Sequence, residues 1–424
     1  MSATDPPRQS AIRTALAGLI GNVLEWFDFA VYGYFASDIG KLYFPESSDT
    51  AQQILAFAVF ALGFGARPVG SIVLGMVGDR IGRRALLTLS IALMGGATLA
   101  IGLLPTYDQI GVAAPILLLL LRLAQGFSLG GEFTGSMVYT TELASPLMRG
   151  LVSSSTAAGT TLGFILGSAS ALLVSALMDP ADAARWGWRI PFVASVVFCI
   201  AGYFLRNNIH ESEQGQKAAS VRAPILESLI SDAGAIVQTF GIVAMTNAAY
   251  YVTFTFAVER RKKMSEEGAS WFLLANTLSL FVVLFAKPLG GWLSDKVGRR
   301  RLMITLTLVT MGVMYFALHV MLYGSALEFL FGQLLLGIPL GMALGLQGAM
   351  VVEIFPLRTR VTSMSFAYSV TLALAGGSAP LVSTWLIETF HEPLAPAFYV
   401  IMYGLIGLAI MWPMTETNAR SLDD

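Results

Sequence analysis

Residues 75–84 read Gly-Met-Val-Gly-Asp-Arg-Ile-Gly-Arg-Arg, and residues 291–300 read Gly-Trp-Leu-Ser-Asp-Lys-Val-Gly-Arg-Arg. Both segments carry glycine, aspartate and two arginines at matching positions; Asp79, for example, matches Asp295. A charged motif that recurs in this way indicates that the chain consists of two related halves. Internal repeats of this kind are typical of membrane transporters.

A second charged motif repeats at nearly the same separation along the chain. Glu142 is followed seven residues later by Arg149, and Glu353 is followed seven residues later by Arg360, with a proline inside each interval. Two motifs duplicated at nearly one separation are difficult to obtain by chance, which strengthens the prediction of a repeat.

The sequence around these motifs is strongly apolar. Of its 424 residues, 55% are hydrophobic and 12% are charged, whereas soluble domains carry about 25% charged residues. So little charge cannot keep this much apolar surface in water. A net charge of −1 excludes a basic surface for nucleic acid. The single cysteine, Cys199, excludes an internal disulfide framework, and three scattered histidines form no metal motif, so no cofactor is expected.

The apolar segments predict an all-α membrane protein with twelve transmembrane helices. A bilayer core about 30 Å thick needs about 20 apolar residues per helix. We expect spans at 12–37, 52–77, 85–104, 114–138, 150–177, 189–206, 234–258, 270–293, 302–322, 326–350, 362–387 and 395–414. The first carries Glu25 and Asp28, which a cleavable signal peptide would not, so it is expected to be a retained helix. The expected division is a six-helix bundle at 1–206, a cytoplasmic linker at 207–232 and a second six-helix bundle at 233–424.

Lysine and arginine mark the cytoplasmic side of a membrane protein. They predict that both termini lie in the cytoplasm. The cluster Arg260–Lys263 breaks the rule and is assigned outside, because the motif at 291–300 sets the inner end of the eighth span. The expected partners are the lipid bilayer and a small-molecule substrate, and the protein is expected to work as a monomer.

Charged side chains inside a span are functional candidates, because each costs about 2.5–3.5 kcal/mol at a helix centre. In the first span Asn22, Glu25, Asp28 and Tyr32 fall within a stripe of about 120° on a helix. A carboxylate buried there can take a proton from one side of the membrane and lose it to the other. We therefore predict a proton-coupling role for Asp28 or Glu25; the alternative is an acid held permanently by a neighbouring arginine. Asn22 and Tyr32 are predicted to bind the substrate.

The fourth span carries Arg122, Gln125 and Glu132 on one helix face within about 80°. Arg122 offers a planar set of donors suited to a carboxylate. It could bind the substrate, neutralise Asp28 in the absence of substrate, or only brace the first helix. Gln125 is a further substrate-binding candidate, and Glu132 is a third candidate for proton coupling.

Two other cations precede prolines inside spans. Lys287 is expected to extend its side chain toward the inner membrane surface, whereas Arg67 lies deeper and is a substrate-binding candidate. Four neutral polar residues of the second half are further substrate-binding candidates, although they could equally be ordinary contacts between helices. These are Asn247, Tyr250, Tyr251 and Tyr368.

The repeated charged motifs predict a latch between the two halves on the cytoplasmic side. A simple positively charged anchor would explain the arginines but not the matched aspartates and glycines. Glycines permit backbone turns that residues with a Cβ rarely adopt. The predicted latch residues are Gly75, Asp79, Arg80, Gly82, Arg83, Arg84, Glu142, Arg149, Asp295, Gly298, Arg299, Arg300, Glu353 and Arg360.

One pattern typical of enzymes is excluded by its context. The segment 126–130 fits the Gly-x-Ser-x-Gly nucleophile motif, but that motif requires a preceding strand and a histidine partner. Here it lies inside an expected helix, so no enzyme is predicted.

The charged and aromatic motifs resemble the major facilitator superfamily and, within it, the metabolite:proton symporters. The resemblance rests on segments 21–29, 67–70, 104–111, 114–115, 122–132, 186–192, 295–300 and 353–356. It implies alternating access by rocking of the two halves, a mid-membrane site between them, and symport with protons. It also implies a place in the inner membrane of a bacterium. Members of that family take up proline and betaine, citrate and tricarballylate, 2-oxoglutarate or shikimate.

Segments 247–251 and 416–420 look most like the proline/betaine branch. Osmosensing members of that branch carry a long C-terminal extension, so osmotic regulation is not expected of a sequence ending at Asp424. The cluster Arg260–Lys263 has no counterpart in the family pattern and could attract anions to the outer mouth.

These observations predict a proton-coupled importer of a small carboxylate-bearing solute, either an organic acid or a zwitterion. The alternatives are an exporter or antiporter of the same fold, and a membrane sensor that does not transport.

Overall fold

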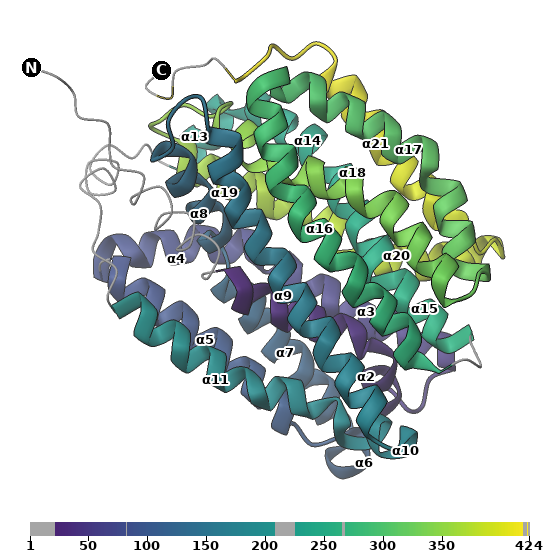
Figure 1. Ribbon diagram of the computed structural model, residues 1–424. Coiled ribbons are helices and arrows are strands. Elements are labelled where there is room, and N and C mark those ends of the chain that lie inside the picture. Colours follow the sequence, from purple (N-terminus) through teal and green to yellow (C-terminus); the bar gives the residue numbers. More distant parts are fainter. Residues whose placement is uncertain (1–21, 82, 208–224, 265–267, 419–421, 423–424) are drawn as a thin grey trace, which may run out of the picture.

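The computed structural model describes residues 22–81, 83–207, 225–264, 268–418 and 422, with side chains for all of these except 75–88, 198, 201–207 and 225–226. The described chain is helical. Its helices form two groups that lie side by side (Figure 1). Elements up to α11, drawn in purple to teal, form one group, and elements from α14 onward, in green to yellow, form the other.

The first group begins with a helix at residues 22–34. It continues with α2 (Ala36–Tyr43), α3 (Asp49–Gly65), α4 (Arg67–Ile81), α5 (Arg83–Leu103), α6 (Tyr107–Ile110), α7 (Ala113–Ser128), α8 (Glu132–Glu142), α9 (Arg149–Leu177), α10 (Pro180–Asp182), the π-helical η1 (Ala183–Gly187) and α11 (Arg189–Asn207).

The short helix α13 (Ile225–Ser231) precedes the second group; most of the expected linker lies outside the described residues. The second group contains α14 (Ala233–Tyr251), the π-helical η2 (Val252–Phe256), α15 (Ala257–Met264), α16 (Ala269–Val297), α17 (Arg299–Tyr323), α18 (Ala326–Val352), α19 (Arg360–Thr371), the π-helical η3 (Leu372–Gly377), α20 (Ala379–Phe390) and α21 (Ala395–Met411).

Each of the twelve expected spans overlaps a helix in the described part of the chain, although residues 12–21 of the first span lie outside the described residues. Eight of these helices are long and apolar enough to cross a membrane, and two shorter apolar helices, Leu89–Leu103 and Ala395–Met411, match two more spans. The remaining two spans correspond to the helix at 22–34 with α2, and to α11. The seventh span is longer than predicted, because its helix continues through the basic cluster to Met264.

Helix ends follow local chemistry. Ser325 and Glu328 form a capping box at the start of α18, where each side chain accepts the other residue's backbone N–H. Gly298 joins α16 to α17 at φ +105°, and Gly131 precedes α8 at φ +111°. A residue with a Cβ would be strained at these two positions, so glycine allows the chain to turn there.

Several spans are not continuous α-helices. The fourth span breaks into α7 and α8 at residues 129–131. The seventh and eleventh spans contain the π-helical segments η2 and η3, both in the second bundle. Such segments are frequent at functional sites, since they redirect side chains and leave backbone groups outside the regular ladder.

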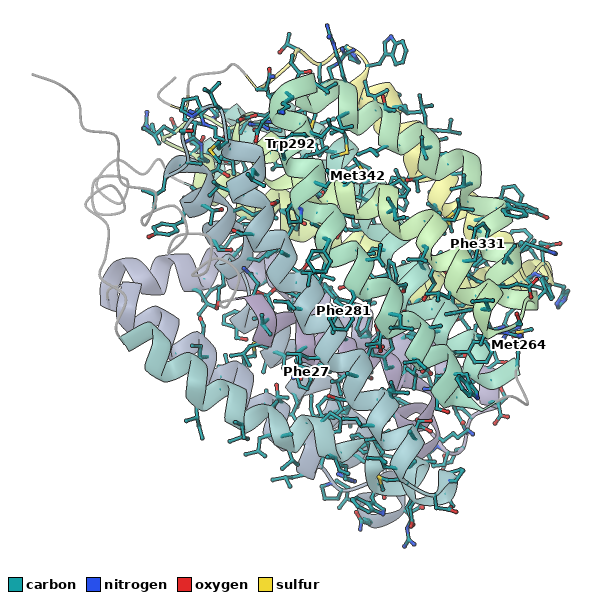
Figure 2. All side chains as sticks on the ribbon, in the orientation of Figure 1. Phe27, Met264, Phe281, Trp292, Phe331 and Met342 are labelled. Carbon is teal, nitrogen blue, oxygen red and sulfur yellow. The ribbon has the colours of Figure 1, made fainter. Side chains whose placement is uncertain are left out.

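The outer surface of the two groups is apolar. Phe281 of α16 and Phe331 of α18, both labelled in Figure 2, are 45% and 53% exposed, whereas Phe27 of the first helix is buried. Large apolar side chains on the outside of helices long enough to span a bilayer are what lipid contact requires.

Helices α9 and α16 form a seam between the two bundles. They cross closely at Gly150 and Gly291, where a Cβ on either glycine would come within 2.4 Å of the other's backbone carbonyl oxygen. Further along, Ser168 of α9 hydrogen-bonds Thr277 of α16. The glycines Gly163 and Gly167 of α9 do not face this seam; they pack on the helix at 22–34 inside the first bundle.

Candidate functional site

The first helix places four polar side chains in the interior, as its helical period predicts. Asn22, Glu25, Asp28 and Tyr32 are at most 2% exposed. Asn22 donates to Ser136 Oγ of α8 over 3.1 Å, and the Tyr32 hydroxyl donates to the Ala56 carbonyl of α3 over 3.1 Å. The two acids between them each meet an arginine of a different helix.

Glu25 pairs with Arg67, the first residue of α4, over 2.8 Å. Their side chains are 1% and 3% exposed. The Arg67 guanidinium carbon also lies 5.3 Å from the Trp26 ring centre and 4.8 Å from that of Phe64. Aromatic faces attract a cation, more strongly when water is excluded, so this ion pair is held in a dry aromatic environment.

Asp28 pairs with Arg122 of α7 more loosely, at 3.5 Å. Gln125, one turn further along α7, bridges them: its amide nitrogen donates to Asp28 Oδ2, and its oxygen accepts from Arg122 over 2.7 Å. The Gln125 nitrogen also donates to Thr98 of α5 over 2.8 Å. The Arg122 guanidinium lies 3.7 Å above the Tyr32 ring centre. This network lies inside the first bundle.

The second bundle contributes neutral and aromatic side chains. Tyr251 of α14 packs edge-on against Phe60 and Phe64 of α3, with ring centres 5.8 and 5.6 Å apart. Tyr250 packs on Phe164 of α9 at 5.0 Å. The other two predicted residues, Asn247 of α14 and Tyr368 of α19, are also buried. The Tyr368 hydroxyl accepts from Gln347 of α18 over 3.4 Å, and its ring packs on Phe133.

The expectation for Lys287 was wrong. Its side chain is 1% exposed and crosses the seam instead of extending to the inner surface. Its ammonium donates to the Ala157 carbonyl over 2.6 Å and to Thr160 Oγ1 over 2.9 Å, both on α9. Oxygen acceptors of the neighbouring helix lie within its reach, so the side chain crosses the interface.

Glu132 does not occupy the predicted position. The face shared with Arg122 and Gln125 assumes one continuous helix, but the chain turns at 129–131, so the helical phase is lost. Glu132 instead begins α8 after Gly131 and is half-buried.

At the end of the seam where Gly150 meets Gly291, Asp295 accepts hydrogen bonds from the backbone N–H groups of Gly150 and Leu151 over 2.8 and 2.9 Å. These belong to the first turn of α9, whose N–H groups have no partner within the helix. Asp295 of the second bundle therefore caps a helix of the first.

The other charged residues of the repeat surround this cap. Arg299 pairs with Asp295 at 3.0 Å and binds both oxygens of Glu353, at 2.5 and 2.7 Å. Arg360 of the second bundle donates to Glu142 of the first over 2.8 Å. The backbone N–H groups of Arg299 and Arg300 donate to Glu416 of the C-terminal segment.

The remaining predicted latch residues are less fully described. Gly298 links α16 to α17, and Arg149 is buried at the start of α9. The side chains of the first-half motif lie outside the described residues; these are Gly75, Asp79, Arg80, Gly82, Arg83 and Arg84.

The basic cluster lies at the end of the seam opposite Asp295. Lys262 is partly buried, donates to Glu259 over 2.6 Å, and also donates to the Tyr34 carbonyl of the first bundle over 2.7 Å. Lys263 donates to Gln53 of α3 over 3.1 Å. These lysines therefore connect the bundles, in addition to any attraction that they exert on anions.

Comparison with known proteins agrees with this arrangement. Residues 14–220 match the family model described as sugar (and other) transporter, and residues 234–422 match that of the major facilitator superfamily. The chain is 32% identical over 423 residues to the proline/betaine transporter of Escherichia coli K12, covering 96% of this chain and 84% of the relative.

The chain belongs to the major facilitator superfamily. It is a multi-pass membrane transporter and not an enzyme. It is also 33% identical to the citrate-proton symporter of Klebsiella pneumoniae, covering 99% of this chain and 97% of the relative. It is 34% identical to the inner membrane metabolite transport protein YhjE of E. coli K12, covering 98% and 97%.

The major facilitator fold is also evident from solved structures. The partially occluded inward-open xylose transporter XylE of E. coli superimposes with a TM-score of 0.76 over 98% of this chain and 100% of that one, at 18% identity. At that identity the likeness shows the fold alone.

Several buried polar residues of this superfamily member escaped sequence reasoning. Asn276 of α16 donates to Tyr34 and to Ser168, both over 2.9 Å, and accepts from Gln333 of α18 over 2.8 Å. Neutral candidates were taken only from the first, fourth, seventh and eleventh spans, so this network of the eighth and tenth spans was missed. A search for amides inside apolar spans would have found Asn276 and Gln333.

Proposed function

We propose that this transporter imports a small carboxylate-bearing solute together with protons, by alternating access, as a monomer in a bacterial inner membrane with both termini in the cytoplasm. The observation that carries the proposal is the pair of buried acid–arginine contacts on the first bundle, opposite an aromatic surface of the second. The relatives named as a proline/betaine transporter and a citrate-proton symporter support it.

Asp28 is the proposed proton carrier because its network can remain hydrogen-bonded when it is neutral. Its contact with Arg122 is long, at 3.5 Å, whereas Arg122 keeps Gln125 at 2.7 Å and the Tyr32 face at 3.7 Å. Protonation of Asp28 therefore removes one partner of Arg122 and leaves two. The proton binds a carboxylate oxygen from the outside and leaves from the same oxygen to the inside.

Glu25 and Arg67 are the proposed charged contacts of the solute. They lie next to aromatic rings that continue into the second bundle through Phe64 and Tyr251. A zwitterion suits such a pair, because its cationic end can face Glu25 and the rings while its carboxylate is left for a cation outside the two ion pairs. We therefore favour a zwitterion over a tricarboxylate, because each arginine already has an acid partner.

The experiment uses the protein in liposomes that contain a pH-sensitive dye, under an inward proton gradient. Proline, glycine betaine, citrate, 2-oxoglutarate and shikimate are added one at a time. Additional acidification with one of them would support symport and identify the solute class. Silence from all five, with the protein orientation verified, would contradict the proposal.

Asp28→Asn tests the carrier itself. The neutral variant is expected to lose proton-driven accumulation and to retain exchange of labelled solute, because the amide preserves the size of the side chain but cannot carry the proton. Accumulation against a gradient by Asp28→Asn would move the proton role to another residue.

A further inference from the structure

Lys287 is a buried cation that has no role in the proposed transport cycle. Its ammonium lies at the seam between the bundles and is bound by two neutral acceptors on α9, Ala157 O and Thr160 Oγ1. Among the described residues no carboxylate lies within ion-pair distance of it. An ammonium withdrawn from water without an acid is costly, and neutral hydrogen bonds offset only part of that cost.

The charges at the centre of the described protein are consequently unbalanced. Arg67 pairs with Glu25 and Arg122 pairs with Asp28, so both arginines are neutralised locally. Lys287 adds one positive charge with the same low exposure, 1%. The carboxylate of a solute would pair with this ammonium, and the cationic end of a zwitterion would still be free to face Glu25 and the rings.

Lys287 borders the same aromatic cluster as the Glu25–Arg67 pair. Its ammonium lies 5.7 Å from the Tyr250 ring centre. Tyr250 packs on Phe164 at 5.0 Å, and Phe164 packs on Trp26 at 6.1 Å, beside Arg67. The two cations thus lie at opposite ends of one continuous group of rings, with Arg67 on the first bundle and Lys287 on the second.

Two buried polar atoms of the described cluster have no hydrogen-bond partner. Among the described residues, the Trp26 indole nitrogen and the Tyr251 hydroxyl are buried without hydrogen bonds. Buried donors of this kind are costly unless a ligand or water satisfies them. They add a second observation, independent of the charge imbalance, that this region receives a polar ligand.

We propose that Lys287 binds the carboxylate of the transported solute and is the charged specificity residue contributed by the second bundle. This inference rests on the proposed function, since it assigns a contact of the same site. Binding replaces the bonds of Lys287 to α9 with a bond to the solute. The seam between α9 and α16 is thereby loosened only when a carboxylate is present, which links solute binding to movement of the bundles.

The first test uses acetate as the probe and does not depend on transport. The melting temperature of the purified full-length protein is measured in sodium acetate and in sodium chloride at equal concentration. Acetate is expected to stabilise the wild type more than chloride does, because a ligand that binds only the folded state raises its stability. Lys287→Gln should remove the difference. Lys296→Gln, the same change at an exposed site on the same helix, should retain it.

An equal effect of acetate and chloride on the wild type would overturn the proposal without any variant. So would an undiminished acetate effect in Lys287→Gln or, if that variant does not fold, in Lys287→Met. In liposomes, the solute that acidifies the lumen should show a KM raised about ten- to hundredfold by Lys287→Gln, with proton coupling retained.

The two proposals fail in different ways. Transport with no acetate-specific stabilisation would overturn the role of Lys287 and leave symport intact. Acetate-specific stabilisation that requires Lys287, with silence from all five solutes, would overturn the proposed solutes and retain an anion site at Lys287.

Discussion

Neutralising Asp295 should open the end of the seam where the repeated motif lies. Asp295 joins the bundles by accepting the N–H groups of Gly150 and Leu151 at 2.8 and 2.9 Å, and its side chain is 5% exposed. Asp295→Asn keeps the size of the side chain and one acceptor oxygen. Its amide nitrogen cannot accept the second N–H, and it brings no negative charge to the start of α9.

The magnitude follows from these contacts. A hydrogen bond to a charged group contributes about 1.5–3 kcal/mol, and a charge at a helix start contributes about 0.3–1 kcal/mol. Losing one bond and the charge should therefore cost the closed arrangement about 2–4 kcal/mol. Such a change would shift an equilibrium between closed and open arrangements by roughly thirtyfold to a thousandfold.

The assay is a distance measurement between two spin labels in a Cys199→Ser background. Leu147 of the first bundle and Leu357 of the second are 83% and 47% exposed, so cysteines there accept labels without disturbing packing. Asp295→Asn should move the distance distribution toward longer separations. Asp182→Asn, an exposed acid in α10, is the matched control and should leave it unchanged.

The reasoning would be refuted by identical distributions in Asp295→Asn and the wild type. That result would mean that Asp295 only anchors its own bundle and that the closure depends on other contacts, such as Arg360 with Glu142.

Two further predictions concern packing and the opposite end of the seam. Gly126→Ala should destabilise the protein by about 1–3 kcal/mol and lower its melting temperature, because the new Cβ would meet the Gly63 carbonyl oxygen. The control Gly96→Ala should be neutral or stabilising, because nothing lies within 4 Å of its Cβ. Equal melting temperatures of the two variants would contradict the close helix crossing. Lys262→Gln should change the KM for the transported solute equally at low and high salt, because Lys262 is partly buried against Glu259. Any KM change caused by Lys263→Gln should disappear in high salt, because Lys263 is exposed and its charge is screened. Uptake measured at both salt concentrations decides between these outcomes.

The first bundle's polar stripe was readable from the sequence. Asn22, Glu25, Asp28 and Tyr32 share a face because helical periodicity is a local property of the chain, and all four are buried together. Within the described residues, the positions of the spans were equally accessible, since length and hydrophobicity alone decide whether a segment can cross a bilayer.

The partners of those side chains were not readable. The sequence left open whether Arg122 faces the solute, Asp28 or only the first helix, and the packing of α7 against that helix joins it to Asp28 and Gln125. Glu132 was misplaced because the break at 129–131 changes the helical phase.

Local periodicity and apolar length thus determined the helices and the buried face of the first span, and the matched charged motifs indicated the repeat. Which acid meets which arginine, and that Lys287 crosses to α9, depended on how helices distant in sequence pack. The physical reason is range: apolar length and helical phase are set within a few turns, whereas an ion pair in a membrane interior forms with whichever polar group the tertiary packing brings within reach.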